Sequence, residues 1–265
     1  MKIKSKLIRI HWFLSIQLGI DPIRFIKAVF ALPIYFRNYF TFRKRYSGRI
    51  KAVPCLHDRY EEGGQTHGEY FWQDLIVARA INEAKPVKHV DIGSRVDGFV
   101  AHIASFRDIE VFDVRSTSVV IPGVVFRQAD LMELESLPIT SSSAYCDSLS
   151  CLHTIEHFGL GRYGDPINPE GYKIGIKNMA QLLKNDGTLY LSTPIGKERV
   201  EFDANWIFDP KSIINCAKDS NLELKRLMVI KSSKVSEVNL FSEQVLDLAK
   251  SDYQLGIFFF KKNAV

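Results

Sequence analysis

Short apolar segments alternate with amphipathic helical patterns from residue 88 to residue 262 of this 265-residue chain. Strands that are separated by helices run mostly parallel, because each helix carries the chain back to the starting edge of the sheet. Such a sheet is covered by helices on both faces. The sequence therefore predicts an α/β protein, a three-layer sandwich around a mostly parallel sheet. Strands are expected at 88–92, 109–114, 124–127, 143–149, 188–192, 223–230 and 254–262, and helices at 66–85, 99–106, 131–137, 169–184, 210–220 and 235–250.

The sharpest local pattern is an apolar strand that enters a glycine-containing turn and then a helix, at residues 89–98. Glycine lets the backbone approach a ligand where a Cβ atom would clash, and the N-terminus of the next helix offers free N–H groups. We expect Asp91, Gly93, Ser94 and Arg95 to contact a bound cofactor. The alternative is that Asp91 only caps the turn.

Two further acids follow the second and third predicted strands. Asp113 ends the segment 109–114, where a carboxylate can accept hydrogen bonds from both ribose hydroxyls of a nucleotide. Asp130 follows the third strand and could bind the exocyclic amine of adenine. The alternatives are a solvated strand-end acid and a helix cap, respectively.

These residues, in this order, resemble the motifs of class I S-adenosylmethionine (SAM)-dependent methyltransferases. The likeness rests on Asp91-x-Gly93, Asp113, Asp130 and the segments 146–157 and 185–194. It implies a Rossmann-like sandwich with a seven-stranded sheet, SAM as the cofactor and Leu149 of the fourth strand among the cofactor contacts. The sequence departs from the usual turn, because Arg95 and Asp97 stand where such enzymes have glycine.

A narrower likeness covers the runs Ser148–Pro166, Gly187–Gly196 and Val200–Pro210. They look like domain-of-unknown-function family 268, whose mostly bacterial members are classed as methyltransferase-like and which we associate with polysaccharide gene clusters. The resemblance implies that the methyl acceptor is a sugar or a surface-polysaccharide precursor.

The segment His153–His157 carries a His-x-x-Glu-His pattern that inverted zinc peptidases also use. Those enzymes place it within a long helix, whereas Gly159 and Gly161 interrupt any helix here, so we expect no metal. An imidazole that titrates near neutral pH suits the removal of a proton from an acceptor hydroxyl. His157 or His153 is the candidate catalytic base, and Glu156 is expected to be structural.

Two loops, 158–168 and 194–210, follow predicted strands and should form the acceptor pocket together, because α/β sheets bind ligands at the carboxyl ends of their strands. Tyr163 and Trp206 could stack on a sugar, Arg162 could meet an acidic group, and Asp165 lies in the same loop. The alternative is that the glycines of the first loop only allow a tight turn.

The first 50 residues differ from the rest in charge and composition. Residues 1–51 hold twelve Lys and Arg against one acid, Asp21, a net charge of +11, whereas the remainder holds 23 basic and 29 acidic side chains. We divide the chain into a basic aromatic helical arm (1–50), a linker (51–66) and the methyltransferase-like domain (67–265). Pro22 and Pro33 are expected to split the arm into short helical pieces.

Basic residues mixed with aromatic residues suit a helix that lies on an anionic membrane surface, or else a cap packed on the main domain. The arm is interrupted by charges, so neither a signal peptide nor a spanning helix is expected. No nucleic-acid partner is expected. The four cysteines form no CxxC pair, which favours a cytoplasmic protein, peripheral on the inner face of the plasma membrane if the arm binds lipid.

The sequence thus favours an O-methyltransferase that acts on a small-molecule or glycan acceptor. Arg95 and Asp97 motivate a second hypothesis, a catalytically inactive binding or scaffold protein of polysaccharide biosynthesis. An NAD-dependent sugar enzyme is a third, which the lack of a full G-x-G-x-x-G motif disfavours. The sequence does not define the oligomeric state.

Overall fold

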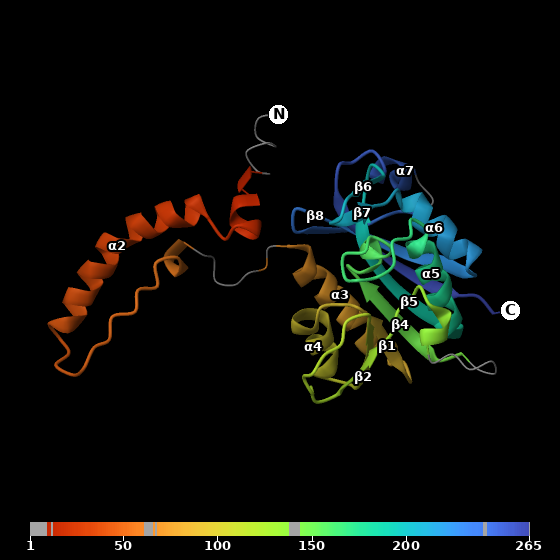
Figure 1. The fold of residues 1–265 in the computed structure, drawn as a ribbon, viewed down its shortest axis with the longest axis horizontal. Coiled ribbons are helices and arrows are strands. Elements are labelled where there is room, and N and C mark those ends of the chain that lie inside the picture. The colour runs from red at the N-terminus through yellow and green to blue at the C-terminus, as the bar shows by residue number, and fades with distance from the viewer. Residues whose placement is uncertain are drawn as a thin grey trace. The chain divides into compact units, whose positions relative to one another are not determined.

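The computed structural model describes residues 10–11, 13–60, 66, 68–137, 144–240 and 243–264. The chain forms two compact units, Met1–Gln65 and Thr66–Val265 (Figure 1). No helix in the described ranges is long and apolar enough to cross a membrane.

The first unit is built on one long helix, α2 (Pro22–Arg43), between a π-helical turn at Phe13–Gln17 and a 3-10 turn at Asp58–Tyr60. Asp21 caps α2, because its side chain accepts hydrogen bonds from the N–H groups of Ile23 and Arg24, both at 3.0 Å.

The expectation that Pro33 divides the arm is wrong, since Pro33 lies inside α2. Val29 and Pro33 are both exposed, so water can hydrate the carbonyl that proline leaves without a donor. Trp12, one of the arm's aromatic residues, lies outside the described residues.

The second unit contains an eight-stranded sheet in the order β3-β2-β1-β4-β5-β10-β8-β9. Its strands are β1 (His89–Ile92), β2 (Ile109–Asp113), β3 (Val124–Gln128), β4 (Cys146–Leu152), β5 (Leu183–Ile195), β8 (Leu222–Lys231), β9 (Lys234–Glu237) and β10 (Gln254–Lys262). The first five in sheet order pair in parallel, whereas β10 is antiparallel to both β5 and β8. The predicted mostly parallel sheet is confirmed. It has one strand more than the predicted seven.

Helices cover both faces of the sheet, which gives the predicted three layers (Figure 1). The helices of the unit are α3 (Glu69–Ala84), α4 (Ala101–Ala104), α5 (Gly171–Leu182), α6 (Pro210–Asp219) and α7 (Gln244–Leu248). A π-helical turn at Val96–Val100 occupies the first part of the helix expected at 99–106. One apolar core joins α5 and α6 to the sheet, and a second joins α3 and α4 to it. Along β2, Val111 and Phe112 enter opposite cores, as the alternation of side chains in a strand requires.

The eighth strand arises where a helix was expected at 235–250. The chain reverses at Ser232 and Ser233, which have φ of 50° and 61°, and Lys231 pairs with Lys234. Positive φ at both central residues is the geometry of a type I′ hairpin turn. The hairpin extends the sheet by β9, and only α7 of the expected helix remains. A smaller hairpin, β6 (Arg199–Glu201) with β7 (Asn205–Ile207), occupies the loop expected at 194–210.

Candidate active site

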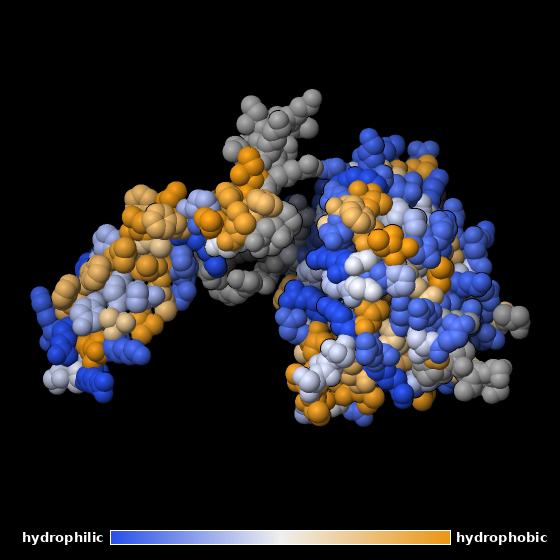
Figure 2. Space-filling model, viewed as in Figure 1, coloured by the Kyte–Doolittle hydropathy of each residue, from blue (hydrophilic) through white to orange (hydrophobic). Residues whose placement is uncertain are grey.

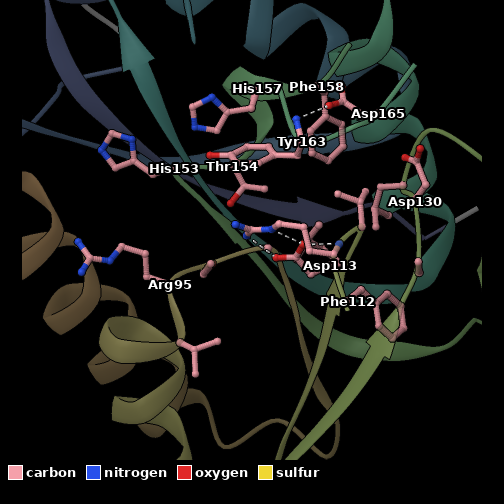
Figure 3. Close-up of a pocket in the computed structure, with 18 of the residues that line it drawn as sticks. Arg95, Phe112, Asp113, Asp130, His153, Thr154, His157, Phe158, Tyr163 and Asp165 are labelled. Carbon is pink, nitrogen blue, oxygen red and sulfur yellow. Dashed lines mark hydrogen bonds and ion pairs between the residues drawn. The ribbon is translucent and has the colours of Figure 1, made fainter. Parts of the chain in front are cut away.

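A cavity of about 520 Å³ opens at the carboxyl ends of β1, β2 and β4 (Figure 3). This is the place where the strand order reverses, since the chain runs from β1 to β2 on one side and β4 lies on the other. Open α/β sheets bind ligands at such a switch point, and the volume lies within the range of small-molecule sites. Residues from the glycine turn, the two strand-end acids, the His-Glu-His segment and the following loop line it.

Asp91 lies beneath the cavity and does not line it. The side chain is fully buried and accepts hydrogen bonds from the Ser94 backbone N–H (2.9 Å), from the Ser94 hydroxyl (2.7 Å) and from Ser150 of β4. Burial raises the pKa of Asp91 to about 6, although these hydrogen bonds oppose the shift. Asp91 therefore fixes the turn against the neighbouring strand, while Gly93 and Ser94 reach the cavity wall.

Gly93 combines a positive φ of 63° with close packing. A Cβ atom at this position would lie 2.5 Å from the methyl group of Thr154, another residue of the cavity wall. Glycine is thus required both by the backbone conformation and by the approach of the segment after β4.

Asp113 faces the cavity but is already engaged by a neighbour. Its carboxylate accepts hydrogen bonds from the backbone N–H and Nε of Arg115 at 2.8 and 2.9 Å, and from Nη2 at 2.7 Å. The side chain of Asp113 is 11% exposed and that of Arg115 is 56% exposed. The Arg115 guanidinium also lies 4.6 Å from the centre of the Tyr163 ring. Asp130 lines the cavity as well, and one of its oxygens accepts a 2.8 Å hydrogen bond from the N–H of Met132.

Arg95 borders the cavity without filling it. Its guanidinium pairs with Asp97 at 2.7 Å, lies 5.0 Å from the centre of the Tyr70 ring and points away from Asp113 (Figure 3). The arginine that replaces the usual glycine therefore leaves the space above Gly93 open.

His153 is buried between two carboxylates. Nδ1 lies 2.7 Å from Glu156 and Nε2 lies 3.6 Å from Glu69, while the ring stacks on Tyr70 at 4.5 Å between centroids. Burial alone lowers the pKa of His153, but the two carboxylates outweigh it and raise the pKa to about 9. His153 is thus an imidazolium cation at neutral pH, and φ is positive at this residue (51°).

His157 has the opposite electrostatic character. Nδ1 lies 2.8 Å from the backbone oxygen of Ala204, which can only accept, so Nδ1 carries the proton and the lone pair is on Nε2. Burial lowers the pKa of His157, although the charge of Glu156 opposes the shift. His157 is therefore neutral at pH 7, and it lines the cavity next to Tyr163 at 5.5 Å between ring centroids.

The loop after His157 is folded around Asp165. One carboxylate oxygen accepts hydrogen bonds from the N–H groups of Gly159 (3.0 Å) and Gly161 (3.2 Å), and the other accepts from Tyr163 (3.1 Å). Tyr163 then lies between His157 and Asp113 in the cavity (Figure 3). Arg162 donates to the oxygen of Ala204 at 2.8 Å, so the two predicted acceptor loops meet at that carbonyl.

Nine of the thirteen residues selected from the sequence line the cavity: Gly93, Ser94, Arg95, Asp113, Asp130, His153, His157, Tyr163 and Asp165. The other four lie outside its wall. Asp91 is beneath the turn, Leu149 is in the core, Arg162 bonds to Ala204, and Trp206 stacks on Phe208. Sequence reasoning missed Tyr70, which only the fold brings to the strand ends, and also Arg115 and Thr154, which follow the ends of β2 and β4 in the sequence.

The His-Glu-His segment forms a 3-10 turn, Ile155–His157, instead of a long helix. Its two histidines are directed to different partners, Glu156 and Ala204. Among the residues that the structure describes, no group of His, Cys, Asp and Glu is arranged to hold a metal ion.

Comparison with solved structures defines the class of fold. The [4+2]-cyclase SpnF aligns with a TM-score of 0.51 at 13% identity, over 77% of this chain and 86% of its own. A proposed sarcosine dimethylglycine methyltransferase from Galdieria sulphuraria aligns with a TM-score of 0.51 at 11% identity, over 72% and 86%. A Burkholderia thailandensis N1-methyltransferase with bound S-adenosylhomocysteine gives 0.47 at 12% identity, over 88% and 89%. The fold is the Rossmann-like fold of class I SAM-dependent methyltransferases.

A family model adds a narrower similarity. Residues 136–214 match the model described as Caenorhabditis protein of unknown function, DUF268. The matched range contains all three runs on which the likeness to this family was based, so that likeness is confirmed. No curated protein matches the sequence.

Proposed function

We propose that this chain is a cytoplasmic SAM-dependent O-methyltransferase whose cofactor binds in the cavity at the β1–β4 switch point. The observation that carries the proposal is the placement of the Gly93 turn and the Asp113 carboxylate on two walls of one cavity. Asp113 would accept hydrogen bonds from the ribose hydroxyls, and Asp130 would accept one from the adenine amine. The proposed acceptor is a hydroxyl group of a surface-polysaccharide precursor.

The Asp113–Arg115 ion pair is compatible with such a ligand. Arg115 is more than half exposed, so its guanidinium can leave the carboxylate and stay hydrated. Asp113 is only 11% exposed, so the two ribose hydroxyls would have to take over the hydrogen bonds that the guanidinium donates, each worth about 1.5–3 kcal/mol to a charged group. Arg115 is then free to remain on the face of Tyr163.

SAM would supply the methyl group, and the chain's own residues would position and deprotonate the acceptor. His157 is neutral, and its Nε2 carries the lone pair, so it can take the proton of an acceptor hydroxyl. His153 holds its proton too tightly to act as a base at neutral pH. Tyr163 lies between His157 and Asp113, and a sugar could stack on the part of its ring that the Arg115 guanidinium does not cover.

Calorimetric titration with S-adenosylhomocysteine tests this proposal. The wild-type chain should bind, and Asp113→Asn should weaken binding by about 10- to 100-fold, because an amide replaces a charged acceptor. Arg115→Ala should leave the affinity unchanged or improve it by up to about fivefold, because it removes a competitor for Asp113. A loss of affinity in Arg115→Ala would place the ligand on Arg115 instead.

The same ion pair also motivates the alternative, a catalytically inactive binding or scaffold protein. In that case Arg115 permanently occupies the acid that a nucleotide needs. The wild-type chain would then bind neither SAM nor S-adenosylhomocysteine in the titration.

The third hypothesis, an NAD-dependent sugar enzyme, is tested by mass spectrometry of nucleotides that copurify with the chain. Copurified NAD would support it.

A further inference from the structure

The charged side chains of helix α2 are all cationic. Its 22 residues include Arg24, Lys27, Arg37 and Arg43 and no acidic side chain. It belongs to the segment 1–51, whose net charge is +11, whereas the rest of the chain is acidic. The helix therefore carries a concentrated positive potential that suits an anionic surface.

The same helix exposes large apolar side chains to solvent. Phe25 is 70% exposed, Val29 47%, Phe36 50% and Phe40 59%. At 3.6 residues per turn these four fall within an arc of roughly 60°, whereas Lys27 lies on the opposite side. Figure 2 shows this helix covered largely by hydrophobic residues. Contiguous exposed apolar surface of this kind marks an interaction site.

The combination fits a lipid interface better than a protein groove or a transmembrane position. Phe30 (69% exposed), Ile23 (52%) and Phe42 (57%) lie well outside the arc, so exposed apolar side chains surround much of the helix and do not form the narrow seam of a helix pair. At 3.6 residues per turn Arg43 falls within the apolar arc and Arg37 lies roughly 60° beyond its edge, and their long side chains can extend from it to lipid phosphates. The described helices include none that could span a bilayer.

We propose that α2 binds the anionic headgroup region of a lipid bilayer, parallel to its surface, with Phe25, Val29, Phe36 and Phe40 in the acyl boundary. Such binding depends jointly on apolar contact and on charge. It does not depend on the proposed methyl transfer, because α2 contributes no residue to the cavity wall.

Cosedimentation of the full-length chain with vesicles tests the proposal. Vesicles of phosphatidylcholine and phosphatidylglycerol should retain the protein, and vesicles of phosphatidylcholine alone should retain much less. The double variant Phe25→Ala/Phe36→Ala should lower the partition coefficient by at least about tenfold. Lys27→Ala/Arg37→Ala should lower it by about 25-fold at low ionic strength, with a smaller effect at high salt.

Phe202→Ala is the matched control, because Phe202 is 74% exposed in the second unit and its loss should leave retention unchanged. Circular dichroism and thermal unfolding of each variant verify that the chain is folded. Equal retention on both kinds of vesicle, or equal retention of both double variants and the wild type, would overturn the proposal. So would a dimer, measured by light scattering, that dissociates in Phe25→Ala/Phe36→Ala while vesicles retain nothing, because α2 would then pair with a second copy.

Discussion

Asp91 is the last but one residue of β1 and Asp113 is the last residue of the neighbouring parallel strand β2, yet only Asp113 reaches the cavity. The sequence places both at the same edge of the sheet but does not show that Asp91 points between β1 and β4, where Ser94 and Ser150 bind it. Arg115 could have been suspected from its position two residues after Asp113. Its bidentate geometry, however, depends on the turn after β2.

The opposite pKa shifts of the two histidines lead to a prediction for catalysis. His157→Asn should reduce kcat by about 10²–10⁴-fold, because the amide can still donate to Ala204 but cannot accept the proton of the substrate. Activity of the wild type should fall on the acid side with an apparent pKa below 6.5, since burial lowers the pKa of His157. The pH profile of methyl transfer measures both effects. An unchanged acid limb in His157→Asn would exclude this histidine as the base.

His153 should influence stability in the alkaline range. Its pKa is about 9 in the folded chain against 6.5 as the ordinary value, so the folded state holds this proton more tightly than the unfolded state. The resulting stabilisation is complete below pH 6.5 and is lost as the pH rises through 9. The difference in Tm between the wild type and His153→Gln should therefore narrow from pH 6 to pH 10. A Tm difference that stays constant over this range would show that the ion pair between His153 and Glu156 does not stabilise the folded state.

At the scale of elements, hydrophobic patterns predicted strands more reliably than turns. The strand expected at 254–262 matches β10 to the residue, and its first seven positions are buried in the structure. The hairpin of β8 and β9 was missed, because Ser232 and Ser233 lack the Asn-Gly signature of a type I′ turn. In place of the helix expected at 131–137, the structure has only a 3-10 turn at Leu134–Ser136.

The loop between the His-Glu-His segment and α5 depends on glycine at one position above all. Gly159 has φ of 76°, and a Cβ atom there would lie 1.8 Å from the backbone oxygen of Asn168. Gly159→Ala should therefore destabilise the chain by more than about 2 kcal/mol and weaken ligand binding. Gly164→Ala is the matched control: φ is 85°, but no atom lies within 4 Å, so only about 1–2 kcal/mol of backbone strain is expected. Urea unfolding of both variants measures the difference, and equal losses would show that the contact with Asn168 is unimportant.

At the scale of the whole molecule, every residue of the cavity wall lies within 66–265. We therefore expect a fragment of residues 66–265 to bind S-adenosylhomocysteine as tightly as the full chain. Titration of both proteins checks the expectation, with Asp113→Asn in the fragment as a control for specific binding. A fragment that is folded by circular dichroism but has lost the affinity would show that the first unit contributes to the site.

The position of β10 has a consequence for biosynthesis. This strand fits between β5 and β8, and it pairs with both along nearly its whole length. The ribosome therefore synthesises β8 and β9 before β10, the strand that joins them to the rest of the sheet. Until Lys262 has left the exit tunnel, β5 and β8 each present an edge of unpaired backbone N–H and C=O groups, and such edges invite association with other nascent chains.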